Sequence, residues 1–259
     1  MTRTIAFVGD THVGSMFALF PDNKKYRINL NRGQRKLLEY WKYFWHECDS
    51  SEVDTIVHMG DVVEGLNRKN SGLNIMVSDL NIQKDAFVDL ITPYIKKRRF
   101  YIISGSGYHE SLDYRFSEDI AQTLNGTFLG DLANLRIKPF KTVINIAHGV
   151  GGTAIYRATK MDREALFMLT AQATGKLKKT DMMIRGHLHY FHYQKTPDIH
   201  SLQVPCWKVW EPNRIFIPLY GRKQPDIGGV IVRYESNNDI TIRERLYPLP
   251  HIADSIKEV

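Results

Sequence analysis

Carboxylate and imidazole side chains follow directly after several apolar stretches of the chain. They are Asp10, His12, Asp61, His148, His187 and His189. The spacings Asp-x-His and His-x-His allow both side chains of a pair to project to the same side of an extended backbone. Sets that mix carboxylate and imidazole suit Mn²⁺, Fe or Zn²⁺ better than Ca²⁺ or Mg²⁺, which prefer oxygen ligands. Each residue alone reads as an ordinary turn or partly buried residue, but the six together predict a divalent-metal site.

The metal site can form only if these residues end neighbouring strands. Short apolar runs predict strands at 4–10, 54–61, 99–104, 142–149 and 181–187, and apolar spacing predicts helices at 32–48, 76–98, 116–125 and 154–175. Ligands bind at the carboxyl ends of the strands in open α/β sheets. We therefore expect five strands to deliver their polar residues to one edge of the fold.

The remainder of the chain looks all-β. The alternating first part and the strand-rich last part predict one α/β domain over residues 1–259, with two facing sheets and helices outside. Residues 205–227, rich in proline and aromatic side chains, are predicted to form an excursion packed on the surface. That excursion is either a substrate or dimer surface or a simple packing feature.

Composition excludes some classes of protein and favours others. No run approaches the ~18 apolar residues of a membrane span, so no membrane partner is expected. The two cysteines are too few for a disulfide scaffold, and no signal-peptide pattern is present, so we expect a cytoplasmic protein. The net charge of +7 favours an anionic partner such as nucleic acid, unless the basic groups are only solvated helix ends and loops. Nothing in the sequence indicates the oligomeric state.

The third predicted strand runs into the sequence SGSGYHE, residues 104–110. Gly105 and Gly107 permit positive φ, and thus a sharp turn. Such a turn could aim Tyr108 or His109 at the predicted metal site.

From its first strand to residue 189, the chain resembles the calcineurin-like metallophosphoesterase superfamily. The resemblance is carried in order by Asp10-Thr11-His12, Gly60-Asp61, the turn at 105–110, His148-Gly149 and Gly186-His187-Leu188-His189. It implies a four-layer α/β/β/α sandwich and two divalent ions, Mn²⁺ first with Fe or Zn²⁺ as alternatives. By motif position, the first ion would be held by Asp10, His12, Asp61 and His189, and the second by Asp61, His148 and His187. Hydroxide bridging the ions would attack the phosphorus.

The strand end at SGSGYHE departs from the family pattern. The family has Gly-Asn-His there, with Asn on the second ion and His hydrogen-bonding the phosphate or protonating the leaving oxygen. Here Ser106 stands where Asn would be, with two residues inserted before His109. Either Ser106 supplies a hydroxyl, directly or through water, and the turn returns His109 to its usual place, or the second ion has three protein ligands. Glu110 could orient His109 or face solvent, and Asn67 could reach the site.

The same resemblance narrows the choice among classes of phosphoester substrate. Phosphoprotein phosphatases of the superfamily carry an arginine soon after Gly-Asp, whereas this chain reads GDVVEGLNRKN, with Glu64 at that point and Arg68 nearby. With the basic charge, this favours a phosphodiesterase acting on nucleic acid or nucleotides, including a nuclease. The alternatives are a phosphomonoesterase and a catalytically impaired nucleic-acid-binding module.

Overall fold

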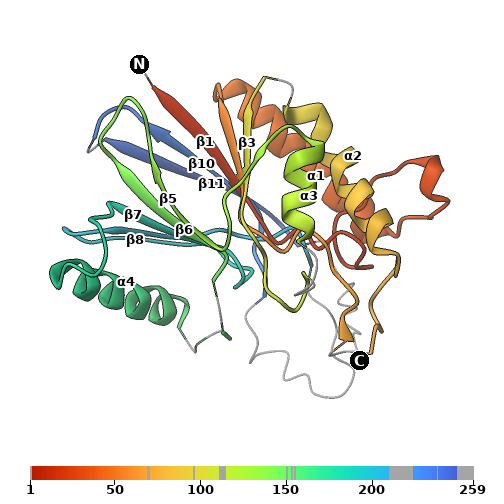
Figure 1. The fold of residues 1–259 in the computed structure, drawn as a ribbon. Coiled ribbons are helices and arrows are strands. Elements are labelled where there is room, and N and C mark those ends of the chain that lie inside the picture. The colour runs from red at the N-terminus through yellow and green to blue at the C-terminus, as the bar shows by residue number, and fades with distance from the viewer. Residues whose placement is uncertain are drawn as a thin grey trace, which may run out of the picture.

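Two β-sheets pack face to face, with helices on both outer sides. The computed structural model describes residues 2–68, 71–95, 97–110, 115–149, 151–152, 154, 156–209, 224–237 and 239–249. Figure 1 shows α1, α2 and α3 on one side of the molecule and α4 on the opposite side. The predicted α/β fold with two facing mixed sheets flanked by helices is confirmed.

The first sheet has the strand order β11-β10-β1-β2-β3-β4. Its strands are β1 Arg3–Val8, β2 Thr55–His58, β3 Arg99–Ile102, β4 Thr127–Phe128, β10 Ile227–Tyr234 and β11 Ile240–Tyr247. The first four run parallel, and β10 is antiparallel to both β1 and β11. Side chains alternate along β1, so Ile5 and Phe7 join the core between the sheets while Ala6 and Val8 join the core beneath the helices.

The second sheet has the order β5-β6-β7-β9-β8. Its strands are β5 Leu132–Arg136, β6 Val143–Ala147, β7 Met182–Arg185, β8 His192–Lys195 and β9 His200–Gln203. Strands β6, β7 and β9 are parallel, so β6 and β7 end at the same edge. Ile144, Ile146 and Ile184 face the first sheet across the central core.

In the part of the chain that the structure describes, four helices cover the sheets, with one short 3-10 turn beside them. They are α1 Arg32–Ser50, α2 Leu80–Ile95, α3 Phe116–Thr123, α4 Arg157–Ala173 and η1 Lys24–Tyr26. Helix α1 begins with a capping box in which Asn31 and Gln34 each accept from the other's backbone N–H. Its buried stripe includes Leu37, Trp41 and Phe44, which pack into the core of the first sheet. Among the described residues, no helix is long and apolar enough to cross a membrane.

The start of the predicted surface excursion is part of the core instead. Residues 205–208 are buried, and the Trp207 side chain is fully covered, with its ring edge-on to Trp41 at a centroid distance of 4.8 Å. Cys206 forms an isolated bridge with Ile227, which brings the chain back to β10. A large aromatic ring gains more from burial than from solvent exposure, which explains the difference. Residues 210–223 of the excursion lie outside the described residues.

Candidate metal centre

The six predicted ligands gather at one edge of the two sheets. Asp10 and His12 follow β1, Asp61 follows β2, His148 follows β6, and His187 and His189 follow β7. Backbone hydrogen bonds hold the segments after β1 and β2 together, since the N–H groups of Asp10 and His12 donate to the carbonyls of Gly60 and Asp61, each at 3.0 Å. The sheets therefore position residues from four separate parts of the chain.

Asp10, His12 and His189 form the first set of donor atoms. The Nε2 atoms of His12 and His189 face each other at 3.0 Å. Asp10 Oδ1 lies 3.2 Å from His189 Nε2 and 3.8 Å from His12 Nε2. This buried oxygen has no hydrogen-bond partner among the described residues. One carboxylate oxygen and two imidazole nitrogens thus converge on a single point.

Asp61, His148 and His187 form the second set. Asp61 Oδ2 lies 2.9 Å from His148 Nε2, and His187 Nδ1 lies 3.2 Å from the same nitrogen. Both rings are fixed from behind, because His148 Nδ1 donates to the Met59 carbonyl at 2.6 Å and His187 Nε2 donates to the Gly151 carbonyl at 2.9 Å. Such bonds decide which ring nitrogen is left to bind a ligand.

The backbone of the predicted ligands is unusual. Asp10, His12, Asp61, His187 and His189 all have positive φ, between 44° and 75°. Residues with side chains rarely adopt this region, and such strain gathers at functional sites when the surrounding structure imposes it. Five of the six predicted ligands therefore share a costly conformation that aims their side chains at one place.

Charge pairing sets the protonation of the second set. Burial raises the pKa of Asp61, but the charge and hydrogen bond of His148 outweigh it and hold that pKa well below its usual range. Burial likewise lowers the pKa of His148, and the charges of Asp61 and Asp10 raise it to about 9. Without an ion, Asp61 is therefore a buried carboxylate paired with the imidazolium of His148. A metal ion bound there would displace the proton on His148 Nε2.

The turn at SGSGYHE works differently from the prediction. Gly105 does not have positive φ, and it serves instead to let two backbones approach. An ideal Cβ at Gly105 would stand 2.9 Å from Asp61 Cα and still closer to the N and Oδ1 of Asp61. The turn thus packs directly on the predicted ligand.

Ser106 is turned toward Asp61. Its N–H donates to Asp61 Oδ1 at 2.7 Å, and its hydroxyl lies 3.0 Å and 3.2 Å from the two carboxylate oxygens. Of the two alternatives predicted for the second ion, these contacts favour three protein ligands, because the Ser106 hydroxyl is engaged with Asp61. Asn67 does not reach the donor sets either, since its amide contacts Glu64 and Tyr108.

The turn does bring His109 to the predicted site. Its Nε2 lies 4.0 Å from Asp61 Oδ2, and its ring stands edge-on to that of His12 at 4.4 Å between centroids. Nδ1 lies 2.7 Å from the Glu64 carbonyl and donates to it, which leaves Nε2 directed at the site. Burial and the charge of His12 lower the pKa of His109 to about 4.

Glu110 fits neither of its predicted roles. The side chain is buried and accepts hydrogen bonds from the Gly105 N–H, at 2.8 Å, and from the Ser117 hydroxyl. It therefore fastens the turn to α3. His58 supports the site from behind, because its fully buried ring contacts the Thr11 hydroxyl and the Gly60 N–H.

Sequence reasoning missed a buried charge pair beside the site. Lys208 Nζ lies 3.0 Å and 2.9 Å from the two carboxylate oxygens of Glu64, whose side chain is fully buried. Burial raises the pKa of Glu64, but the hydrogen bond from His12 and the charges of His12 and Lys208 lower it to about 2. The sequence signal was weak, because a glutamate in a polar loop is usually solvated.

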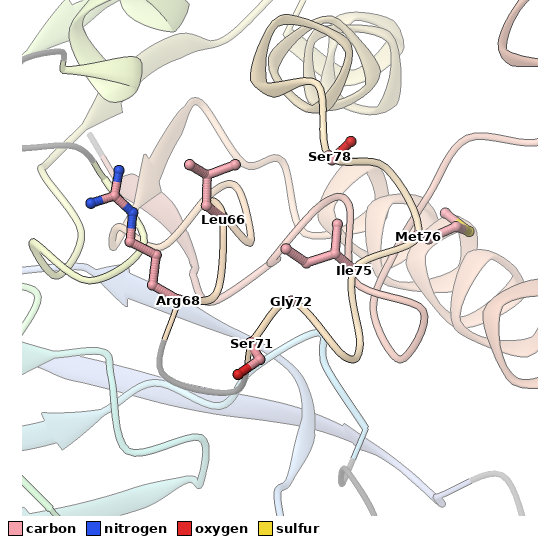
Figure 2. Close-up of a pocket in the computed structure, with 7 residues that line it drawn as sticks. All are labelled: Leu66, Arg68, Ser71, Gly72, Ile75, Met76 and Ser78. Carbon is pink, nitrogen blue, oxygen red and sulfur yellow. The ribbon is translucent and has the colours of Figure 1, made fainter.

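A shallow hollow of about 480 Å³ lies on the loop that follows Asp61. Figure 2 shows its lining, with Arg68 and Met76 on opposite sides and Leu66 and Ile75 between them. None of the predicted ligands lines it. The hollow is a feature of the loop and separate from the donor atoms.

The donor atoms suit a divalent transition metal. Within each set, the ligand atoms all lie within 4.8 Å of one another. The buried Asp10 Oδ1 has no hydrogen-bond partner among the described residues, and the Nε2 atoms of His12 and His189 face each other beside it. A cation between them would satisfy all three, so the residues present fit the ions that the resemblance implies.

Comparisons with known proteins reveal similarity only to solved structures. No family model and no curated protein matches the chain. An archaeal phosphodiesterase is 12% identical, with 94% of this chain and 99% of that chain covered and a TM-score of 0.47. Vps29 of Entamoeba histolytica complexed with Zn²⁺ is 13% identical, covering 94% and 98%, with a TM-score of 0.43. A predicted phosphoesterase of Streptococcus pneumoniae is 12% identical, covering 95% and 99%, with a TM-score of 0.38. At such values the case for an activity depends on the chain's own residues.

Proposed function

We propose that the chain is a metal-dependent phosphoester hydrolase of the calcineurin-like metallophosphoesterase type, and specifically a phosphodiesterase that acts on nucleic acid or nucleotides. The observation that carries the proposal is the position of Asp61 between two groups of imidazoles. Its Oδ2 lies 2.9 Å from His148 Nε2 in the second set, and an Asp61 oxygen also lies within 4.8 Å of a ring nitrogen of His12, a member of the first set. A carboxylate shared in this way suits a pair of ions acting on one phosphate.

The two donor sets would hold the two ions. Asp10, His12 and His189, with Asp61 shared, would hold the first, and Asp61, His148 and His187 the second. When bound, divalent ions supply an activated water and neutralise charge on the phosphate oxygens. Mn²⁺ is the first choice for this donor set, with Fe or Zn²⁺ as alternatives.

His109 is assigned to the oxygen that leaves. The bond from Nδ1 to the Glu64 carbonyl fixes the ring and directs Nε2 toward Asp61, at the edge of the donor sets. The charge of a bound phosphate would raise the pKa of His109, and the protonated Nε2 would then hydrogen-bond the phosphate or protonate the leaving oxygen. Because His109 is not one of the six predicted ligands, we expect its removal to affect turnover more than ion binding.

The orientation of Ser106 makes the two proposed ion sites unequal in their number of protein ligands. Its hydroxyl is engaged with Asp61, so the second set offers three protein ligands where the family pattern has four. We therefore expect two Mn²⁺ ions to bind with different affinities, the weaker at Asp61, His148 and His187. The same departure favours the alternative of an impaired binding module.

A diester is the preferred substrate on two grounds. The chain has Glu64 in the segment soon after Gly60-Asp61 where phosphoprotein phosphatases of the family carry a phosphate-gripping arginine. Its net charge of +7 favours a polyanionic partner.

The test compares bis-p-nitrophenyl phosphate with p-nitrophenyl phosphate. Metal-stripped protein is resupplied with Mn²⁺, and Asp61→Asn and His109→Ala are assayed beside wild type. His109→Ala should reduce diester turnover by about 10²–10⁴-fold, the usual contribution of a general acid. His46→Ala, on the exposed face of α1, is the control histidine and should retain full activity.

Each outcome leads to a definite conclusion. Mn²⁺-dependent diester cleavage that falls in both variants supports the phosphodiesterase and calls for nucleic-acid and cyclic-nucleotide substrates. Cleavage of the monoester alone replaces it with a phosphomonoesterase. Bound Mn²⁺ without turnover of either ester favours the binding module.

A further inference from the structure

A buried ion pair stands behind His12. The Glu64 carboxylate is fully buried, and Lys208 reaches both of its oxygens from 144 residues further along the chain. Asn67 Nδ2 donates to Glu64 Oε1 at 2.9 Å, so the carboxylate is held from two sides. A buried ion pair of this kind contributes little net stability, because desolvation of both charges offsets their attraction. Its presence calls for another role.

The second carboxylate oxygen faces the imidazole of His12. Glu64 Oε2 lies 3.1 Å from His12 Nδ1, a buried nitrogen that has no aligned hydrogen-bond acceptor among the described residues. The opposite ring nitrogen, Nε2, faces His189 Nε2 at 3.0 Å in the first donor set. The two nitrogens of His12 therefore face a fixed acceptor on one side and the predicted metal position on the other.

We propose that Glu64 is the positioning residue for His12. The carboxylate accepts the Nδ1 proton, which selects the tautomer whose Nε2 carries the free lone pair and prevents the ring from rotating. A carboxylate behind a metal-binding histidine fixes its orientation and increases its basicity. The assignment of His12 as an ion ligand rests on the proposed function, whereas its tautomer can be tested without any ion.

Lys208 completes the arrangement. A carboxylate in a buried site needs a compensating charge, and Lys208 Nζ supplies it at 2.9 Å. The Lys208 backbone is fixed close to the site, because it pairs with Ala18 and the preceding Trp207 N–H donates to the Asp10 carbonyl. The segment after β9 thus supports the first donor set without joining it.

Two matched double variants isolate the hydrogen bond from the charge. Glu64→Gln with Lys208→Met removes both charges but keeps an acceptor for His12 Nδ1. Glu64→Leu with Lys208→Met removes the charges and the acceptor together. Thermal unfolding verifies that both fold. The readouts are Mn²⁺ affinity by calorimetry and the His12 tautomer, observed by two-bond ¹H–¹⁵N correlation in metal-free protein.

The expected results differ between the two variants. The leucine variant should lose the Nδ1–H tautomer of His12 and bind Mn²⁺ about 10–100-fold more weakly, the usual loss when such a support is removed. The glutamine variant should keep the tautomer and recover most of the affinity. Equal behaviour of the two variants, or an unchanged tautomer in the leucine variant, overturns the proposal. Wild-type protein that shows the tautomer but hydrolyses no ester refutes the proposed function alone.

Discussion

Replacing Gly105 with alanine tests how tightly the SGSGYHE turn must pack against Asp61. The new Cβ would stand 2.9 Å from Asp61 Cα, whereas an ordinary contact begins at 3.4 Å, so the segments must separate by at least about 0.5 Å. The Cβ would also overlap the N and Oδ1 of Asp61, which demands a larger movement. Because Gly105 lacks positive φ, alanine is permitted by the backbone and only this contact is tested.

The movement has two measurable consequences. Overpacking a buried contact costs about 1–3 kcal/mol of unfolding free energy, which at ~2–4 °C per kcal/mol lowers the Tm by several degrees. A displacement approaching 1 Å at a reacting site costs about 10²-fold in rate. We therefore expect Gly105→Ala to fold, to bind Mn²⁺ weakly and to lose about 100-fold of its diester turnover.

Thermal unfolding, Mn²⁺ titration and bis-p-nitrophenyl phosphate turnover measure these effects in one preparation. Gly152→Ala is the matched control, because its φ is not positive and a Cβ there would meet nothing within 4 Å. It should keep the wild-type Tm and turnover. If Gly105→Ala retained Mn²⁺ affinity and turnover within twofold of wild type, the close approach of the turn to Asp61 would have no functional role.

Three further predictions concern the whole domain. Chelation by EDTA should lower the Tm and added Mn²⁺ should restore it, because an ion that binds only the folded protein stabilises the fold, by about 2.7 kcal/mol when Mn²⁺ is at 100 times its Kd. A Tm that changes with neither EDTA nor Mn²⁺ would contradict a metal centre. Cys48 and Cys206 are fully buried and burial raises the pKa of the Cys48 thiol, so neither should react with a thiol reagent until denaturant is added; rapid labelling of native protein would disprove this. Phe44→Ala should reduce the unfolding free energy by about 3–5 kcal/mol in urea titration, because the ring is fully buried against Gly229 and Trp207; a loss below 1 kcal/mol would show that the core closes around the gap.

The strands and the gathering of predicted ligands could be predicted because buried parallel strands leave a clear signal. Each reads as a short apolar run that stops at a polar residue, and their carboxyl ends meet at one edge. Asp61 follows a strand of the first sheet and His148 a strand of the second. The expectation that the polar residues at strand ends gather at one edge was still sufficient to predict that the two meet.

Other parts of the site could not be predicted from the residues. Glutamate and lysine in loops are usually solvated, so nothing indicated that Glu64 and Lys208 meet in a buried pair. A glycine can be required either for positive φ or for the close approach of two backbones, and the sequence alone does not distinguish these. The role predicted for Gly105 was therefore wrong. Trp207 was assigned to a surface excursion because neighbouring prolines suggested a loop, whereas its ring fills the core.

The place of β1 in the first sheet has a consequence for synthesis. β1 lies between β2 and β10, and its antiparallel partner begins only at Ile227. At about 5–20 residues per second, a ribosome needs roughly 10–45 s to travel from Val8 to that strand. Throughout this interval the nascent chain presents the unpaired edge of a strand that is almost wholly buried in the finished fold, a template for wrong pairing. Protection of that edge during translation is therefore a requirement separate from the stability of the finished sandwich.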